Sequence, residues 1–274
     1  MDNRPIGIFD SGLGGLSVVK EFLSLLPNEN IVYFGDTGRV PYGTKGSNTI
    51  IKYARQDEAF LLSKDVKMVI AACGTVSSVA KNTLDDLSVP SLGVVEPSAK
   101  AAAVLTKNKK VGIIGTAGTV KSESYKKSIH AIDDTIEVYS EACSLFVQIV
   151  EQGWIADDDE VAFLTAKRYL QPLKDKGVDT LILGCTHFPL IAGVISRVMG
   201  ENVTLISSGV ETAKQAKFIL TENNMLNDGS KKAYQEYYVS DSPESFLKTA
   251  EVFLQSKITS NVEQIKIENY GKKD

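Results

Sequence analysis

The chain contains few of the residues that build metal centres and disulfide frameworks. Its 274 residues include two histidines, His130 and His187, and three cysteines. Two histidines exclude a histidine-rich metal site, and three cysteines without dense spacing exclude the disulfide scaffold of a small secreted domain. The cysteines are instead typical of free thiols in a reducing cytoplasm.

Strong charge and long apolar runs are also missing. The formal net charge is −4 and the pI is near 5.4, which argues against nucleic acid or an anionic membrane as partner. No apolar run is long enough to span a bilayer, and residues 1–5 lack the apolar core of a signal peptide. We therefore expect a cytoplasmic protein with no nucleic-acid or membrane partner and one large domain or two small ones.

Two apolar, β-branched segments each end in a cysteine. Residues 66–72 precede Cys73, and residues 178–184 precede Cys185. Each segment predicts a buried strand followed by a turn, and the carboxyl ends of such strands are where open α/β sheets build their sites. We expect one cleft with a thiol on each wall, an arrangement that suits moving a proton across a substrate from one face to the other.

A cysteine that only fills core space is the alternative for either residue, since free Cys is among the most buried residue types. The repeated context favours chemistry for the pair. Cys143 has no such twin, and we expect it to be structural.

The repeat extends beyond the cysteines, with predicted helices between the strands. The matching segments are 5–12 with 110–117, 31–34 with 136–139, and 92–95 with 204–206. This alternation predicts an α/β fold of two similar domains, each a mainly parallel sheet flanked by helices, with the active site in the cleft between them.

The last 65 residues return to the first half. The elements predicted there are a helix over residues 211–220, a strand over 237–239, a helix over 242–254 with a serine cap and a first-turn proline, and an edge strand over 262–267. We therefore expect a discontinuous first domain, residues 1–97 plus 210–274, and a second domain, residues 98–209. Two crossings between them would form a hinge that closes the cleft on a small ligand.

Asp10 ends the first predicted strand and precedes a glycine-rich turn. Such a turn before a helix is typical of phosphate sites, and Asp36 would then be the ribose ligand of a dinucleotide. The third glycine position is Ser17, and Asp10 would set a carboxylate against the pyrophosphate. Both features argue against that alternative.

His187 follows Cys185 by two residues, so the two side chains can share a proton or face one ligand. A positive neighbour lowers the pKa of a thiol from about 8.5. The alternatives are a turn histidine bonded to backbone, and zinc bound by Cys73, Cys185 and His187 with an open fourth position. These ligands come from separate loops without a Cys-x-x-Cys pair, which argues against a metal.

The predicted turns also carry hydrogen-bond donors suited to a small zwitterion or dicarboxylate. Pro41 and Gly43 would fix a turn that presents Tyr42. A helix N-cap is the alternative for any single threonine. The hydroxyl side chains are Thr75, Thr116, Thr119, Ser122 and Thr186.

In combination these motifs resemble the glutamate racemase family of the cofactor-independent aspartate/glutamate racemase superfamily, over essentially the whole chain. The matching segments are residues 7–16, 33–36, 41–43, 71–73, 93–97, 150–153 and 183–190. The resemblance implies interconversion of L- and D-glutamate without pyridoxal phosphate or another cofactor, supplying D-glutamate for peptidoglycan synthesis. Members are often dimers, so a homodimer is one expected assembly.

The resemblance also implies roles for individual residues. One cysteine, as thiolate, would take the Cα proton and the other, as thiol, would return one to the opposite face, with Cys73 acting on the D- and Cys185 on the L-enantiomer. Asp10 would assist Cys73, while His187 and Glu151 would assist Cys185. The implied substrate-binding residues are Asp10, Ser11, Pro41, Tyr42, Gly43, Gly74, Thr75, Thr116, Thr119, Thr186 and His187.

One position departs from the family pattern. The first cysteine is normally followed by Asn-Thr, and here Gly74 and Thr75 follow it. We expect the missing amide to leave space for water and to weaken binding or rate, so that Gly74→Asn raises kcat/KM. A turn that only glycine tolerates is the other explanation. The alternative functions are an aspartate racemase or related enzyme, and a weakly active amino-acid-binding homologue.

Overall fold

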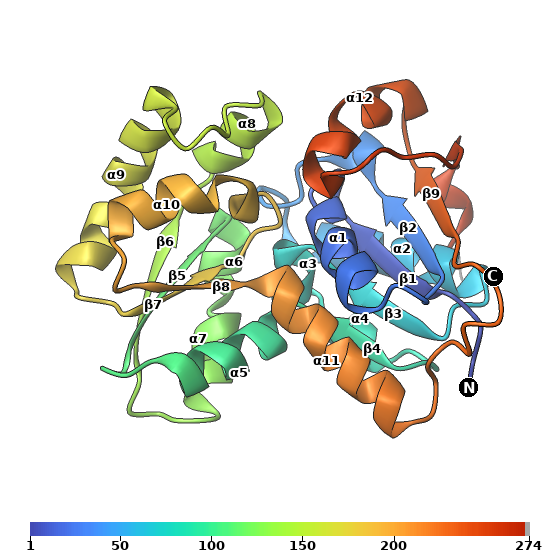
Figure 1. Ribbon diagram of the computed structural model, residues 1–274, viewed down its shortest axis with the longest axis horizontal. Coiled ribbons are helices and arrows are strands. Elements are labelled where there is room, and N and C mark those ends of the chain that lie inside the picture. The colour runs from blue at the N-terminus through green and yellow to red at the C-terminus, as the bar shows by residue number, and fades with distance from the viewer. Residues whose placement is uncertain (272–274) are drawn as a thin grey trace.

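The structure, a computed structural model, describes residues 1–271 and has two α/β lobes (Figure 1). The first lobe contains a six-stranded sheet in the order β10-β9-β2-β1-β3-β4, and the second a four-stranded sheet in the order β6-β5-β7-β8. Neighbouring strands pair in parallel in both sheets. The predicted fold class is therefore confirmed.

The elements are short and alternate along the chain. The strands are β1 (Ile6–Asp10), β2 (Ile31–Gly35), β3 (Met68–Ala71), β4 (Ser91–Gly93), β5 (Lys110–Gly115), β6 (Glu137–Ala142), β7 (Thr180–Leu183), β8 (Thr204–Ser207), β9 (Gln235–Val239) and β10 (Val262–Gln264). The helices are α1 (Leu16–Leu25), α2 (Ser47–Ser63), α3 (Gly74–Val79), α4 (Lys81–Asp85), α5 (Val95–Leu105), α6 (Ala117–Ser122), α7 (Ser124–His130), α8 (Leu145–Glu151), α9 (Glu160–Asp175), α10 (Ala192–Met199), α11 (Ser208–Glu222) and α12 (Pro243–Leu254). Three 3₁₀ turns are η1 (Thr37–Arg39), η2 (Phe188–Ile191) and η3 (Ile267–Asn269).

The central strands of the first sheet are apolar on both faces because helices cover both. Every residue of β1, β2 and β3 is buried. Helices α1, α11 and α12 pack together over one face, and α2, α3 and α4 contact the other. Double-sided burial explains why these segments form continuous apolar runs and not an alternating pattern.

Parallel register brings the ends of the strands to one edge. Asp10 pairs with Gly35, and Phe9 pairs with Ala71. In the second sheet Ile114 pairs with Leu183. The turns that follow β1, β2, β3, β5 and β7 therefore open toward the space between the lobes, where sites form in such sheets.

The chain after α11 joins the first sheet, since β9 pairs with β2 and β10 pairs with β9. Two predicted strands were too long: β4 ends at Gly93, where α5 begins two residues later, and β10 ends at Gln264. The buried side chain of Ile267 lies in η3 instead. The proposed division into residues 1–97 plus 210–274 and 98–209 stays a prediction, and residues 272–274 lie outside the described chain.

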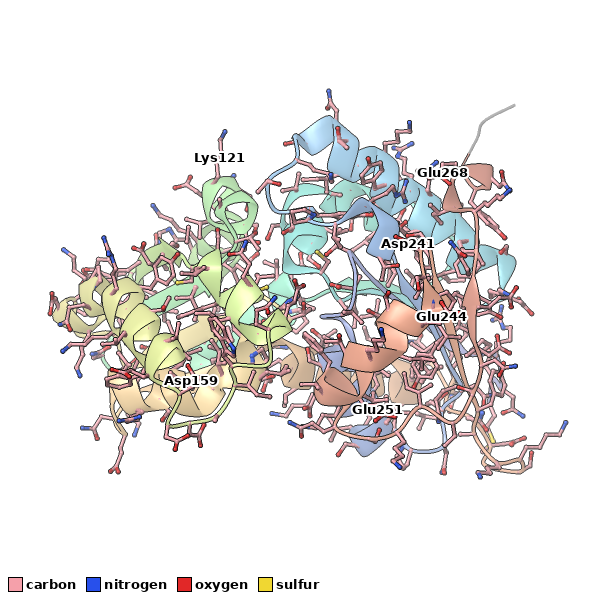
Figure 2. All side chains as sticks on the ribbon, turned by 90° about the horizontal axis from the view of Figure 1, so that it is seen from above. Lys121, Asp159, Asp241, Glu244, Glu251 and Glu268 are labelled. Carbon is pink, nitrogen blue, oxygen red and sulfur yellow. The ribbon has the colours of Figure 1, made fainter. Side chains whose placement is uncertain are left out.

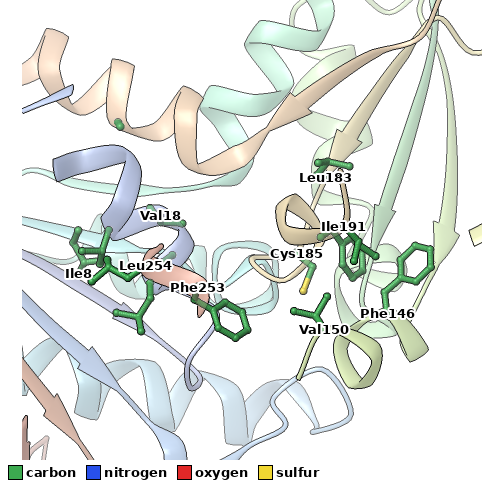
Figure 3. Close-up of a cluster of buried hydrophobic side chains, with 14 of the residues drawn as sticks. Ile8, Val18, Phe146, Val150, Leu183, Cys185, Ile191, Phe253 and Leu254 are labelled. Atoms are coloured by element: carbon green, nitrogen blue, oxygen red, sulfur yellow. The ribbon is translucent and has the colours of Figure 1, made fainter. Parts of the chain in front are cut away.

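The two lobes are connected by two chain crossings and by one of the apolar clusters. The chain crosses between the sheets in α5 and α11, which contact each other (Figure 1). One buried cluster contains side chains of both lobes. Figure 3 shows part of it, with Val18, Phe253 and Leu254 from the first lobe and Val150, Cys185 and Ile191 from the second.

Charged side chains lie on the outside of both lobes. Charged side chains such as Lys121, Glu244, Glu251 and Glu268 are exposed and project outward in the view from above (Figure 2). Within residues 1–271, no helix combines the length and apolarity needed to cross a membrane.

Candidate active site

A cavity of about 140 Å³ lies between the lobes at the carboxyl ends of the strands. The side lined by the first lobe consists of Asp10, Ser11, Gly12, Leu13, Val40, Pro41, Tyr42, Gly43, Thr44, Cys73, Gly74 and Thr75. The side lined by the second consists of Thr116, Ser144, Val147, Gln148, Glu151, Gly184, Cys185, Thr186 and His187. The structure thus brings together all of the predicted site residues except Thr119.

Cys73 forms one wall at the turn between β3 and α3. Its thiol lies 3.6 Å from the Ser11 hydroxyl and is 5% exposed. Burial, reinforced by the nearby Asp10 carboxylate, raises the pKa of Cys73 to about 12. At neutral pH this thiol therefore keeps its proton.

Asp10 lies beside Cys73 at the end of β1. Its Oδ2 accepts a hydrogen bond of 3.0 Å from the Gly12 N–H, and its Oδ1 has no hydrogen-bond partner among the described residues. Burial raises the pKa of this carboxyl. One N–H of the glycine-rich turn thus donates to the Asp10 carboxylate and is not free for a phosphate. Asp36 is fully buried, so its carboxylate cannot reach a ribose. Both findings oppose a dinucleotide in this turn.

Cys185 forms the opposite wall after β7, next to His187. The distance from Sγ to the imidazole Nδ1 is 3.8 Å, and the imidazole Nε2 lies 3.0 Å from a Glu151 carboxylate oxygen. Burial opposes a charged imidazole, but the contacts with Cys185 and Glu151 outweigh it and raise the pKa of His187 to about 10. A cationic imidazole held against a thiol favours the thiolate.

The hydroxyl groups divide into those that line the cavity and those that support it. The Thr75 and Thr116 hydroxyls lie 3.0 Å apart across the two lobes. Thr119 lies behind Thr116 at 3.1 Å, and Ser122 is also absent from the lining. The predicted turn places Tyr42 at the cavity, but its hydroxyl bonds with Asp36 and Asp57 inside the first lobe.

Comparison with known proteins identifies the family. The profile described as Asp/Glu/Hydantoin racemase matches residues 27–216. A glutamate racemase of Geobacter metallireducens is 46% identical over 266 residues, covering 97% of each chain, and one of Thermoanaerobacter pseudethanolicus is 43% identical over 270 residues, covering 98% of this chain and all of that one. The crystal structure of glutamate racemase from Francisella tularensis in complex with D-glutamate has a TM-score of 0.91 at 40% identity, covering 98% of this chain and 100% of that one.

The chain belongs to the Asp/Glu/hydantoin racemase family. It is an amino-acid racemase, and so an isomerase. The resemblance expected from the sequence is confirmed.

In this racemase the environment of Gly74 differs from the expectation. A Cβ atom on Gly74 would lie 2.2 Å from the Gly184 carbonyl oxygen of the opposite lobe. No space for water or an amide exists on that side, so the expected gap is wrong. The backbone of Gly74 does not have positive φ either. A side chain at this position would require the two main chains, which approach each other closely, to move apart.

Helix α8 supplies cavity residues that the sequence reasoning missed. Ser144, Val147 and Gln148 line the cavity together with Glu151. Their spacing places them on one face of a helix, so the position of Glu151 was a signal that could have identified them. Outside that face, Cys143 is fully buried in the core cluster.

Metal ligation has no ready-made cluster in the described part of the chain. Within residues 1–271, no group of three His, Cys, Asp or Glu side chains is arranged to hold an ion. The two nitrogens of the His187 imidazole face other side chains: Nδ1 faces Cys185 and Nε2 faces Glu151.

Proposed function

We propose that this racemase interconverts L- and D-glutamate by two-base proton transfer between Cys73 and Cys185. The observation that carries the proposal is the pair of cysteines on opposite lobes facing one small cavity, each with a different partner. The glutamate racemase relatives, which match nearly the full chain, support glutamate as the substrate.

The surroundings of the two cysteines favour a definite first step. Cys73, with its raised pKa, is the proton donor, and Cys185, whose Sγ lies 3.8 Å from the His187 imidazole, is the base for the L-enantiomer. With L-glutamate, the Cys185 thiolate takes the Cα proton and the electron pair of that bond delocalises into the α-carboxylate. The Cys73 thiol then delivers its proton to the opposite face, giving D-glutamate. The reverse reaction begins with the cysteines in the opposite states.

Charged neighbours assist each cysteine. Asp10 lies on the Cys73 side, where a buried carboxyl can exchange a proton with the thiol, and His187 with Glu151 does the same for Cys185. The Oδ1 of Asp10, which has no hydrogen-bond partner among residues 1–271, also suits the substrate ammonium group.

Neutral donors bind the substrate carboxylates. Among residues 1–271, no arginine or lysine lines the cavity, so hydroxyls and main-chain N–H groups fill this role. Ser11, Thr75, Thr116 and Thr186 supply the hydroxyls, and Tyr42, Gly43 and Gly74 supply main-chain N–H groups. Donors aimed at the carboxylate stabilise the charge that develops during deprotonation.

Chiral analysis of products from L-glutamate and L-aspartate tests the proposal. We expect D-glutamate from the wild type and none from Cys73→Ala or Cys185→Ala. Cys143→Ala is the matched control, because this cysteine is buried outside the cavity. In D₂O under single-turnover conditions, deuterium should enter the product enantiomer. Early incorporation into recovered substrate as well would contradict two separate bases.

The proposed product, D-glutamate, leads to a proposal about physiological role. We infer that D-glutamate made by this enzyme is used in peptidoglycan synthesis. Expression of the chain should restore growth to a bacterium that requires added D-glutamate for its wall, and the Cys73→Ala variant should not. Equal rescue by both would contradict this role.

A further inference from the structure

Four polar side chains form a buried cluster directly behind the loop that carries Pro41–Gly43. The Arg39 guanidinium contacts Asp36 through Nε at 2.6 Å and Asp57 through Nη2 at 3.1 Å. The Tyr42 hydroxyl reaches the Oδ2 atoms of both carboxyls, at 3.1 Å for Asp57. Both aspartates are fully buried, and Tyr42 is 1% exposed.

The number of hydrogens available around the Tyr42 oxygen determines the protonation state of the two carboxyls. A phenol has one O–H hydrogen, yet the Tyr42 oxygen faces two carboxyl oxygens. If both carboxyls were anionic, one of them would face the lone pairs of Tyr42 in a dry environment, which is costly. One carboxyl must therefore hold a proton and donate it to Tyr42.

The remaining contacts identify which carboxyl this is. Asp36 has the shorter contact with Arg39 and accepts a further hydrogen bond of 2.7 Å from the Ser240 hydroxyl. Asp57 has the longer contact with Arg39. With Asp36 as the anion and Asp57 as the acid, Arg39 balances one negative charge and each donor has an acceptor.

We propose that Asp57 is a positioning residue: a carboxylic acid that stays protonated at neutral pH, donates to Tyr42 and so holds residues 40–44 in place as a wall of the substrate cavity. This inference rests on the proposed function, because it assigns Asp57 a part in binding the same substrate. Asp57 lies on α2 and does not line the cavity itself.

The surroundings of Asp57 fit a retained proton. Burial raises its pKa well above the usual value, the Asp36 carboxylate raises it further, and Arg39 opposes the shift. Tyr42 also faces it, Glu58 is its neighbour on α2, and the Tyr53 ring covers the Arg39 guanidinium at 3.9 Å. A second anion at this position would have to share one arginine with Asp36.

Removing the proton should loosen the loop. Two carboxylates would then compete for Arg39, and Tyr42 would lose a donor. Because residues 40–44 line the cavity, the effect should appear as weaker substrate binding and a higher KM, with a smaller change in kcat.

Two substitutions at one site separate an acid from an anion. Asp57→Asn keeps the shape, a donor for Tyr42 and an acceptor for Arg39, so KM should stay within about 2-fold of the wild type at pH 7. Asp57→Ala removes all of these, and KM should rise at least about 10-fold, because the loss of a single buried hydrogen bond can already cost about that factor. Glu58→Gln is the matched control, since that buried carboxyl bonds with Thr83 and not with the loop.

A thermal measurement tests the proton independently of activity. The folded wild type holds one proton more than the unfolded chain above the ordinary aspartate pKa, so its stability falls as pH rises toward the folded pKa. Asn does not titrate, so the Tm of Asp57→Asn minus that of the wild type should increase from pH 5 to pH 8. Both proteins contain Glu58, so its titration affects both Tm values; Glu58→Gln is a control for KM and not for Tm.

The outcomes distinguish the two proposals. A constant or decreasing Tm difference, or a KM for Asp57→Asn as high as that of Asp57→Ala, would show that Asp57 is an anion and overturn the inference. If the wild type does not racemise glutamate, the proposed function fails while the Tm comparison still decides the state of Asp57. That comparison also decides it if Asp57→Ala does not fold.

Discussion

Gly74, next to Cys73, lies against Gly184, next to Cys185 in the other lobe. A methyl group at this position would have to displace the Gly184 carbonyl, which is main chain and cannot rotate away like a side chain. The lobes would separate, and with them the two thiols. An error of about 1 Å in the placement of reacting groups can cost up to about 100-fold in rate.

We therefore expect Gly74→Ala to lower kcat/KM about 10- to 100-fold, and Gly74→Asn to lower it at least as much. This reverses the expectation drawn from the sequence. Gly46→Ala is the matched control, because a Cβ at Gly46 meets no atom within 4 Å and its φ is −69°. Steady-state kinetics in both directions would check the effect, and an unchanged or improved kcat/KM for Gly74→Asn would restore the original interpretation.

His187 gives a pH dependence at the same scale. Its folded pKa of about 10 exceeds the ordinary value of 6.5, so the folded chain holds a proton that the unfolded chain releases between these values. The stabilisation is complete below pH 6.5 and disappears as pH rises through about 10.

The Tm of the wild type minus that of His187→Gln should therefore decrease from pH 6.5 to pH 10. Thermal melts at intervals of half a pH unit would measure this. His130→Gln is the control, since His130 lies outside the cavity and contacts a main-chain carbonyl. A difference that stays flat would mean that the imidazole is neutral beside Cys185.

At the scale of elements, a buried ion pair joins four separate segments of the first lobe. Lys67, just before β3, lies 2.5 Å from Glu29, and both side chains are almost completely buried. The same ammonium donates to the carbonyls of Asp2 at 2.6 Å and Met225 at 2.7 Å. The pair thus holds the beginning of the chain and the segment that leads to β9 against the sheet.

Lys67→Met should lower the free energy of unfolding by about 3–5 kcal/mol, because it leaves Glu29 buried without its partner. Denaturant unfolding would measure the loss. Lys81→Met is the control: its pairs with Asp85 and Glu96 are exposed and should contribute about 0–1 kcal/mol. Similar losses for both variants would contradict a special contribution from Lys67.

The sequence predicted the elements whose signal is local. Apolar runs identified β1, β2, β3 and β7, and the serine and proline before α12 marked its beginning, where the Ser242 side chain caps the helix. The end of β10 was missed because residues 265–267 alternate like a strand, although Ile267 is buried in a 3₁₀ turn.

Features that depend on contacts between distant segments could not be predicted. The pattern around Cys73 identified a thiol at a strand end, but not that Gly184 of the other lobe would lie against Gly74. Likewise Tyr42 was predicted at the cavity, and only the packing of α2 shows that its hydroxyl points at Asp57. Family resemblance identified the cavity-lining residues better than spacing did, because it carries this three-dimensional information.

At the scale of the whole molecule, specific contacts join the two lobes beside the cavity. The Ser17 hydroxyl donates to the Thr186 carbonyl at 2.7 Å, and the Phe253 ring lies edge-on to the His187 imidazole at 5.1 Å. Both contacts join an element of the first lobe to the turn that carries Cys185. These contacts therefore help to position the second thiol at the cavity.

The whole-molecule arrangement also predicts that the reaction needs no added cofactor. The net change is a proton exchanged between two faces of one carbon, and the two thiols with their charged neighbours can supply both proton transfers. No residue of the cavity lining in the described chain is a lysine, so a Schiff base with pyridoxal phosphate has no attachment point there.

We expect racemisation to continue unchanged after dialysis against EDTA, and the purified protein to show no pyridoxal absorbance. The Cys143→Ala protein, treated in parallel, controls for thiol damage during dialysis. Loss of activity with chelator that zinc restores would instead assign Cys73, Cys185 and His187 to a metal.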